Sequence, residues 1–351
     1  MLSSILCTMV LWFGSNNVSL VFKPEIIYQV PSEEAAVLED PADVTFDEKG
    51  NLYILDSSGK SILVWDPEGR FVKSIGREGD GPGEFRFEDP VRSELTYDGE
   101  HIVVWDDKAG KIQYFKNMEY VKTRNKPVGL GSVPVFECLK NGNAIMWLQQ
   151  RRNGVLHSRI ILVDSTTLEE IKVLSEMKDE MYQRNEKGGW DFYPYSKKPI
   201  IHADYFSDRI YVGNAVDSEI AIYQIDGEEL GELQMSLPPR EHTPADRFNI
   251  MKHYSWLKAP NKPIFSDYKR LYDTIVPISA NQVLVSPYDM DEGFYNGHVY
   301  DSESSRVLGG FKQFFGEQGG IYYSNSQIIA FYNDESGNYS IKLLKASLQP
   351  D

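Results

Sequence analysis

Five polar residues occupy matching places in successive segments of this 351-residue chain, and together they could form a binding site. Each lies in or beside a short apolar run that is typical of a β-strand. They are Asp43, Arg92, Glu137 (Phe136 fits the same place), His202 and Asp273. A ring of carboxylates, a guanidinium and an imidazole can bind a polar ligand. The alternative is structural, because Asp43 and Arg92 could form an ion pair between neighbouring segments.

The same residues bear on whether the chain has a catalytic centre. A catalytic zinc site needs three protein ligands, and of the six histidines only His202 falls at a matching place. The Gly-x-Ser-x-Gly turn that carries the nucleophile of many serine hydrolases is absent from the sequence. We therefore predict no catalytic residue, no metal and no cofactor.

A second candidate surface lies in residues 236–269, which interrupt the regular pattern. Thr243-Pro244 is a typical helix start, and apolar residues follow at roughly helical spacing, which predicts an amphipathic helix. Phe248, Tyr254 and Trp256 are the aromatic residues that we expect to contact a partner. The alternative is that they pack on the rim of the protein's own fold.

The segments that carry the polar residues are units of antiparallel sheet. Between Pro41 and Phe85, four short apolar runs are separated by turns that begin with Asp and carry Gly near their end. Related units begin near residues 89, 134, 199, 270 and 319, and the last shows only three strands. A β-sandwich would also suit short strands at this spacing, but about six recurring units favour a propeller.

We therefore predict an all-β fold, a six-bladed β-propeller of four-stranded antiparallel blades. The missing strand of the last blade is expected to come from residues 22–30, which closes the ring. On this interpretation residues 18–351 form one domain and the protein is a monomer.

Apolar content of 41% is typical of a globular chain, whereas a net charge of −16 argues against a nucleic-acid partner. The two cysteines argue against a disulfide framework, and Cys138 is expected in the core.

Residues 1–17 need a separate interpretation. The apolar run Ile5–Phe13 is too short to span a bilayer and is similar to the apolar region of a signal peptide, although no Lys or Arg precedes it. We expect an exported protein, periplasmic or at the cell surface, whose membrane contact is limited to an N-terminal anchor. Lipidation of Cys7 fits less well, because Ile5-Leu6 are not small residues. An additional frayed strand is the remaining alternative.

Residues 47–85 resemble an NHL repeat. The resemblance rests on Asp-x-x-Gly-Asn-Leu-Tyr-Ile-Leu-Asp at 47–56, Ile-Leu-Val-Trp-Asp-x-x-Gly at 62–69 and the glycine-rich segment at 75–85. As a whole the chain is similar to bacterial six-bladed propeller proteins with NHL-like or TolB-like blades, many of which are exported or lipid-anchored. The resemblance implies the propeller fold, with a central channel whose mouth is formed by loops.

The resemblance leaves two functions open. The first is a non-catalytic exported module that binds an unknown small molecule or protein at the channel mouth. The alternative is a metal-dependent hydrolase or lyase of the propeller lactonase or amidating-lyase kind. Asp43, Glu137 and Asp273 could supply oxygen ligands as in the lactonases, but no asparagine aligns with them.

Overall fold

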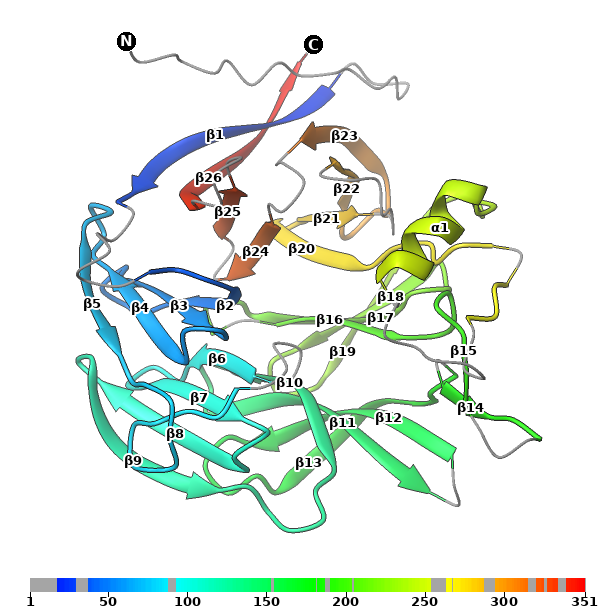
Figure 1. Cartoon of the computed structure of the whole chain (residues 1–351). Helices are drawn as coiled ribbons and strands as arrows, with labels where there is room; N and C mark the ends of the chain where they lie inside the picture. Colours follow the sequence, from blue (N-terminus) through cyan, green and yellow to red (C-terminus); the bar gives the residue numbers. More distant parts are fainter. Residues whose placement is uncertain are drawn as a thin grey trace.

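The predicted strands pair in chain order into six four-stranded antiparallel blades around a central axis (Figure 1). The structure is a computed structural model that describes residues 18–29, 37–87, 93–152, 155–180, 182–186, 190–203, 205–253, 263–266, 268–286, 294–314, 320–324, 327–333 and 339–350. The prediction of an all-β six-bladed propeller is confirmed.

The first three blades follow one another without interruption. Their strands are β2 (Pro41–Phe46), β3 (Leu52–Asp56), β4 (Ser61–Trp65) and β5 (Phe71–Ile75); β6 (Ser93–Tyr97), β7 (Ile102–Asp106), β8 (Lys111–Lys116) and β9 (Glu119–Asn125); and β10 (Ser132–Cys138), β11 (Asn143–Arg152), β12 (Val155–Asp164) and β13 (Glu170–Lys178). A two-stranded hairpin, β14 (Tyr182–Arg184) and β15 (Trp190–Phe192), then precedes blade 4.

The last three blades complete the ring. Their strands are β16 (Pro199–His202), β17 (Arg209–Asn214), β18 (Glu219–Gln224) and β19 (Glu229–Gln234); β20 (Thr274–Ser279), β21 (Gln282–Ser286), β22 (Phe294–Asp301) and β23 (Val307–Phe314); and β24 (Gly320–Ser324), β25 (Gln327–Asn333), β26 (Tyr339–Pro350) and β1 (Val18–Tyr28). The helix α1 (Pro244–His253) lies between blades 4 and 5, in the segment for which the sequence predicts a helix.

The Asp-Gly turns form as their residue types predict. The Asp47 carboxylate accepts hydrogen bonds from the backbone N–H groups of Lys49 and Asn51, both at 2.9 Å. Gly50 has a φ of +81°, a conformation that residues with a Cβ avoid. These local bonds fix the register of β2 and β3, and so the height of every side chain on the first strand of the blade.

Apolar side chains fill the spaces between neighbouring blades. One cluster joins blade 1 to blade 6 through Trp65, Ile54 and Phe331, and another joins blade 1 to blade 2 through Leu55 and Phe115. Cys138 is buried, as predicted. Each sheet thus buries both faces, which explains why its central strands are apolar in nearly every position.

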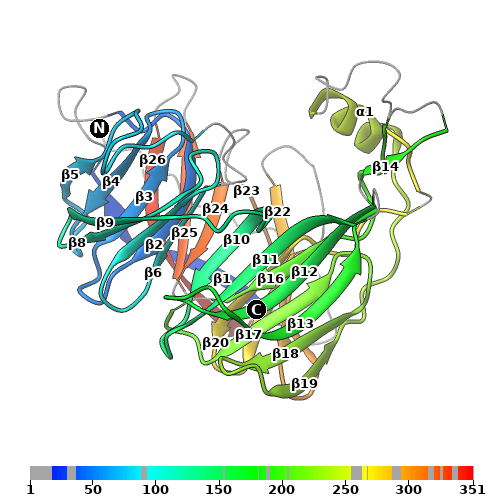
Figure 2. The same cartoon turned by 90° about the horizontal axis from the view of Figure 1, so that it is seen from below.

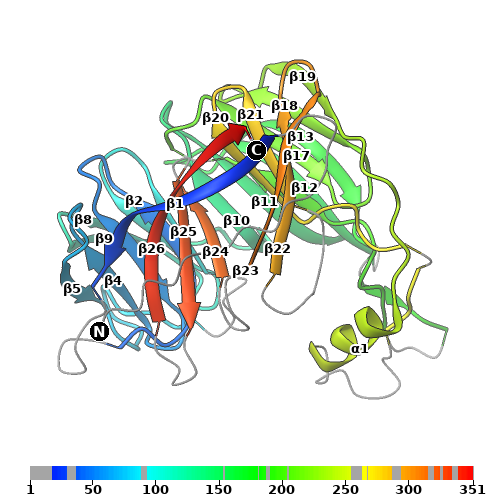
Figure 3. The same cartoon turned by 90° about the horizontal axis from the view of Figure 1, so that it is seen from above.

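The first strand of the chain closes the ring. β1 pairs antiparallel with β26, with Ile26 opposite Leu343 and Ile27 opposite Lys342 (Figure 3). Leu20 is 1% exposed and packs with Leu284 of blade 5 and Leu344 of blade 6. The predicted closure is confirmed; the strand starts at Val18, earlier than expected. In the described part of the chain, no helix is long and apolar enough to cross a membrane.

Candidate ligand-binding site at the channel mouth

The first strand of each blade lines the channel, and its pairing sets the height of each side chain. Asp43 lies opposite Leu55 in blade 1, and Glu94 lies opposite Trp105 in blade 2. Both carboxyl residues stand equally far from the turn that follows. Glu94 is therefore the blade 2 counterpart of Asp43, at the place where the sequence pattern predicts Arg92. Arg92 itself lies outside the described residues.

The two carboxyl groups occupy neighbouring inner strands. Asp43 Oδ2 accepts the N–H of Leu95 at 2.7 Å, which ties blade 1 to blade 2, and Oδ1 accepts the N–H of Val44 at 2.8 Å. Burial raises the pKa of Asp43 to about 7. Burial, followed by the charges of Asp43 and Glu137, raises the pKa of Glu94 as well. Burial therefore favours the protonated form of both carboxyl groups in this part of the channel.

Glu137 and His202 lie at a second height, further from the channel mouth. Their partners across the ladders are Ile145 and Tyr211, which places both residues level with Thr96. Thr96 donates its hydroxyl to Glu137 Oε1 at 2.8 Å. His202 is 8% exposed. Of the predicted residues that the structure describes, Asp43 therefore lies at a different height along the channel from Glu137 and His202.

Asp273 belongs to a charged cluster at the start of the inner strands of blades 4 and 5, which includes Lys198, Arg270 and Asp179. Burial raises the pKa of Asp273 to about 6, against the opposing effects of the Thr274 hydroxyl, Lys198 and Arg270. Burial and the charge of Arg270 lower the pKa of Lys198, while Asp273 and Asp179 act to raise it. These residues were not predicted apart from Asp273, although Lys198 stands directly before a predicted strand.

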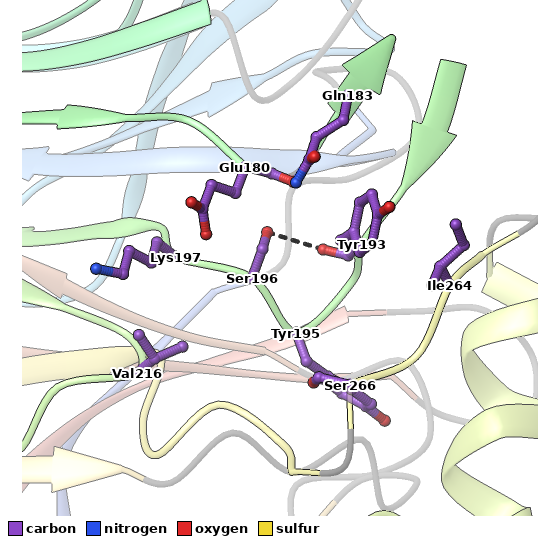
Figure 4. A pocket seen from close by; sticks show the side chains of 9 residues that line it. All are labelled: Glu180, Gln183, Tyr193, Tyr195, Ser196, Lys197, Val216, Ile264 and Ser266. Carbon is purple, nitrogen blue, oxygen red and sulfur yellow. Dashed lines mark hydrogen bonds between the residues drawn. The ribbon is translucent and has the colours of Figure 1, made fainter. Parts of the chain in front are cut away.

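A cavity of about 250 Å³ lies beside this cluster (Figure 4). Glu180 and Lys197, which line it, are the chain neighbours of Asp179 and Lys198. Tyr193 and Tyr195 add aromatic walls, and Ser196 donates its hydroxyl to the carbonyl of Tyr193 at 2.8 Å. Ser196 also accepts a bond from Arg270 Nε through its carbonyl at 3.1 Å. The cavity and the charged cluster therefore share one backbone segment.

The chain segments that precede blades 4 and 5 are joined beside the cavity by hydrogen bonds, ring contacts and an ion pair. The N–H of Ile264 donates to the carbonyl of Phe192 at 2.7 Å, and the ring of Tyr195 stacks on His242 with centroids 5.7 Å apart. Lys269 Nζ pairs with Asp246 of α1 at 2.6 Å. Figure 2 shows that α1 and β14 both project beyond the blades at the same end of the channel. The long connections before blades 4 and 5 thus build one wall at this end of the channel.

The outer surface of α1 carries an exposed aromatic side chain. Phe248, one of the three predicted partner-binding aromatics, is 68% exposed, whereas Ile250 is fully buried. Tyr254 and Trp256 lie outside the described residues. The prediction that this surface contacts a partner stays a prediction.

The opposite end of the channel is crossed by the loop between β16 and β17, which we call the plug. Tyr205 and Phe206 of the plug contact the ring of Tyr97 in blade 2, with centroids 4.9 and 6.3 Å away. Phe206 also shares a cavity with Phe46 of blade 1 and Gln327 of blade 6. Because blade 1 lies across the ring from blade 4, the plug spans this end, and the α1 end is the candidate mouth.

Potential metal ligands are scattered over the described part of the channel. Among them, no group of three or more His, Cys, Asp or Glu side chains is arranged to hold a metal ion. Asp43 and Glu137 stand at different heights, and Asp273 belongs to the cluster with Lys198. In the described part of the chain, the three carboxyl residues that could have supplied metal ligands, Asp43, Glu137 and Asp273, therefore do not come together.

These features define a six-bladed propeller with a charged channel mouth and a side cavity. Residues 33–249 match the model of the DUF5128 family, described as a 6-bladed beta-propeller, and the chain belongs to that family. A comparison with curated proteins finds no significant match.

Two solved structures share the fold. A "Putative exported protein" from Bacteroides fragilis NCTC 9343 is 16% identical with a TM-score of 0.60, over 95% of this chain and 96% of that chain. A member of the DUF4221 family from Bacteroides vulgatus ATCC 8482 is 12% identical with a TM-score of 0.56, over 96% of this chain and 100% of that chain. At these identities the likeness shows the fold alone.

Proposed function

We propose that this protein is an exported, monomeric and non-catalytic binding module that takes a small zwitterionic ligand, such as an amino acid or the end of a peptide, at the α1 end of its channel. The observation that carries the proposal is the cavity that Glu180 and Lys197 line together with Tyr193 and Tyr195. A carboxylate and an ammonium in one cavity can pair with the two charges of a zwitterion. The aromatic rings supply apolar surface beside them.

The rigidity of the cavity wall supports a binding function. Tyr195 is buried and its ring contacts both His242 and Phe265, so that its position is set before a ligand arrives. A wall fixed in advance lowers the entropy lost on binding. The charge of −16 supports a ligand or protein partner over nucleic acid.

Export is supported by three observations. The apolar run at residues 5–13 is similar to the apolar region of a signal peptide, and one structural relative is named as a "Putative exported protein". The NHL-like pattern of residues 47–85 agrees with a place among exported propellers. Cell fractionation with an antibody against the blades tests this proposal, and protein found only in the cytosol would contradict it.

The ligand is tested by thermal unfolding in the presence of single amino acids and dipeptides. We expect at least one of them to raise Tm, because a ligand that binds only the folded state stabilises it. Lys197→Met and Glu180→Gln should abolish the rise, whereas Lys23→Met, at an exposed position on β1, should keep it. If no compound raises Tm, or if both cavity variants keep the rise, the proposal is wrong.

The alternative, a metal-dependent hydrolase or lyase, is distinguished by elemental analysis of protein purified without chelators. The binding proposal expects no stoichiometric zinc or calcium. A stoichiometric metal that is lost in an Asp43→Ala, His202→Ala double variant would favour the alternative.

A further inference from the structure

We infer a second ligand site at the plugged end of the channel, suited to a small organic cation with an N–H donor, such as an arylalkyl primary amine or a guanidinium compound. It lies in a cavity of about 360 Å³ between blade 1, blade 6 and the plug. This volume falls within the range of roughly 300 to 1,000 Å³ that is typical of small-molecule sites. The inference does not depend on the function proposed for the mouth.

Aromatic rings form much of the wall of this cavity. Tyr28 and Phe46 are buried, and Phe206 of the plug is partly exposed. Ile26 and Leu343 complete the apolar surface. The face of an aromatic ring carries negative electrostatic potential and attracts a cation, and the apolar residues accommodate the body of an organic molecule.

All side-chain polar groups that line the cavity, apart from the phenol of Tyr28 and the amide nitrogen of Gln327, are acceptors or anions. Asp47 and Glu48 supply carboxylates, and no Lys, Arg or His is among the described lining residues. Lys49, next to Glu48 in the chain, directs its ammonium to Asn117 Oδ1 at 3.2 Å, outside the cavity lining. The lining therefore favours a positively charged ligand.

One buried acceptor makes the assignment more specific. Gln327 Oε1 is buried and has no hydrogen-bond partner among the described residues. A buried carbonyl oxygen without a donor costs free energy, and a rotation of the Gln327 amide toward the cavity would let a ligand N–H group recover it. A primary ammonium or a guanidinium offers that donor, whereas a quaternary ammonium does not.

The two carboxylates of this cavity differ in the number of hydrogen bonds that they already accept from the protein. Asp47 already accepts bonds from Asn51 Nδ2 at 2.7 Å and from the Tyr53 hydroxyl at 3.1 Å, in addition to its turn. Glu48 is exposed at the tip of the same turn. We therefore assign the ionic contact to Glu48, the ring contact to Phe206 and the N–H acceptor to Gln327.

The test is calorimetric titration of the full chain with phenethylamine, which is protonated at neutral pH. We expect binding that weakens about tenfold for Glu48→Gln, for Phe206→Ala and for Gln327→Leu, because each removes one charged, aromatic or polar contact. The N,N,N-trimethyl analogue should bind more weakly than phenethylamine, and uncharged 2-phenylethanol more weakly still.

Matched controls keep the test specific. Glu303→Gln and Phe248→Ala change an exposed carboxylate and an exposed aromatic residue away from this cavity, and binding should be unchanged in both. Lys197→Met, which tests the mouth, should also leave phenethylamine binding unchanged. The inference is overturned if phenethylamine does not bind, if 2-phenylethanol binds equally well, or if Glu48→Gln has no effect. The Glu48 variant changes an exposed side chain, so that loss of folding does not obscure the result.

Discussion

The carboxyl groups of Asp43 and Glu94 lie on neighbouring inner strands, where burial favours their protonated forms. Their backbone surroundings oppose this effect only in part, since the N–H groups of Leu95 and Val44 donate to Asp43. The folded state therefore binds protons at these two groups more tightly than the unfolded state does. The pair therefore links the pH of the solution to the stability of the ring.

The sign of this linkage gives a prediction for Asp43→Asn. The pKa of Asp43 is about 7 in the folded state and near the ordinary 3.8 in the unfolded state, so stability should fall as pH rises between these values. The difference corresponds to at most about 4 kcal/mol, and we expect about half of it because the residue is only half-buried. Urea unfolding between about pH 4 and pH 8 should show a flatter profile for Asp43→Asn. Asp226→Asn, at an exposed turn, serves as control, and an unchanged slope in Asp43→Asn would contradict the assignment.

For individual residues, the sequence could predict which polar side chains lie on the inner strands, but not all of the residues that surround them. Asp43 and Asp273 were identified because they fall at similar places in successive units. Glu94 was not predicted. The Asp98-Gly99 turn sets the register of this blade, so the distance in residues from that turn would have identified Glu94 as the counterpart of Asp43. Lys198 and Arg270 acquire their environment from the packing of blades 4 and 5, which leaves no periodic signal in the sequence.

The plug is the element that separates the two ends of the channel. Its position depends on a close contact between the Tyr205 ring and the β6–β7 turn, where Gly99 has a φ of +95°. A Cβ at Gly99 would lie 2.3 Å from Tyr205 Oη. Glycine is therefore required here both by the backbone conformation and by the plug.

Gly99→Ala should destabilise the protein by about 1 to 3 kcal/mol, from backbone strain and from displacement of the plug. Gly110→Ala is the matched control, because Gly110 also has a positive φ, +63°, but nothing lies within 4 Å of its Cβ position. Adding Tyr205→Ala should recover part of the loss in Gly99→Ala and none in Gly110→Ala. A double-mutant cycle by urea unfolding measures the difference, and equal costs at both glycines would show that the contact has no effect.

The course of the plug could not be predicted from its sequence. Residues 203–208 lie between two strand-like runs with no periodic signal of their own, and only the tertiary contacts of Tyr205 with Tyr97 and Gly99 show where this loop lies. The same holds for the hairpin β14–β15. It is joined to the α1 segment by contacts such as that between Phe192 and Ile264, which have no signature in residue spacing.

The whole molecule depends on the pairing of β1 with β26. The blades could be predicted because the Asp-Gly turns recur. The closure could be predicted because the last unit shows only three strands, whereas a strand without a blade precedes the first unit. The mouth cavity was not specifically predictable, because three irregular segments form it.

Leu20→Ala should lower the free energy of unfolding by about 2 to 5 kcal/mol, because it opens a cavity between blades 5 and 6. Ile27→Ala on the same strand is the control, since Ile27 is 64% exposed, and it should change stability by less than about 0.5 kcal/mol. Urea unfolding followed by tryptophan fluorescence measures both. If the two variants lose similar stability, the buried face of β1 does not stabilise the closed ring.

The place of β1 also bears on how the molecule is made. On the ribosome this strand emerges before any blade, yet its partner in blade 6 is synthesised only after the other five blades. The first five blades can form before blade 6 is synthesised. The contact between β1 and β26 joins residues that are far apart in the sequence, and such contacts form slowly. We therefore expect the ring to close only when β1 pairs with β26, so that a nascent chain halted before residue 339 cannot complete blade 6.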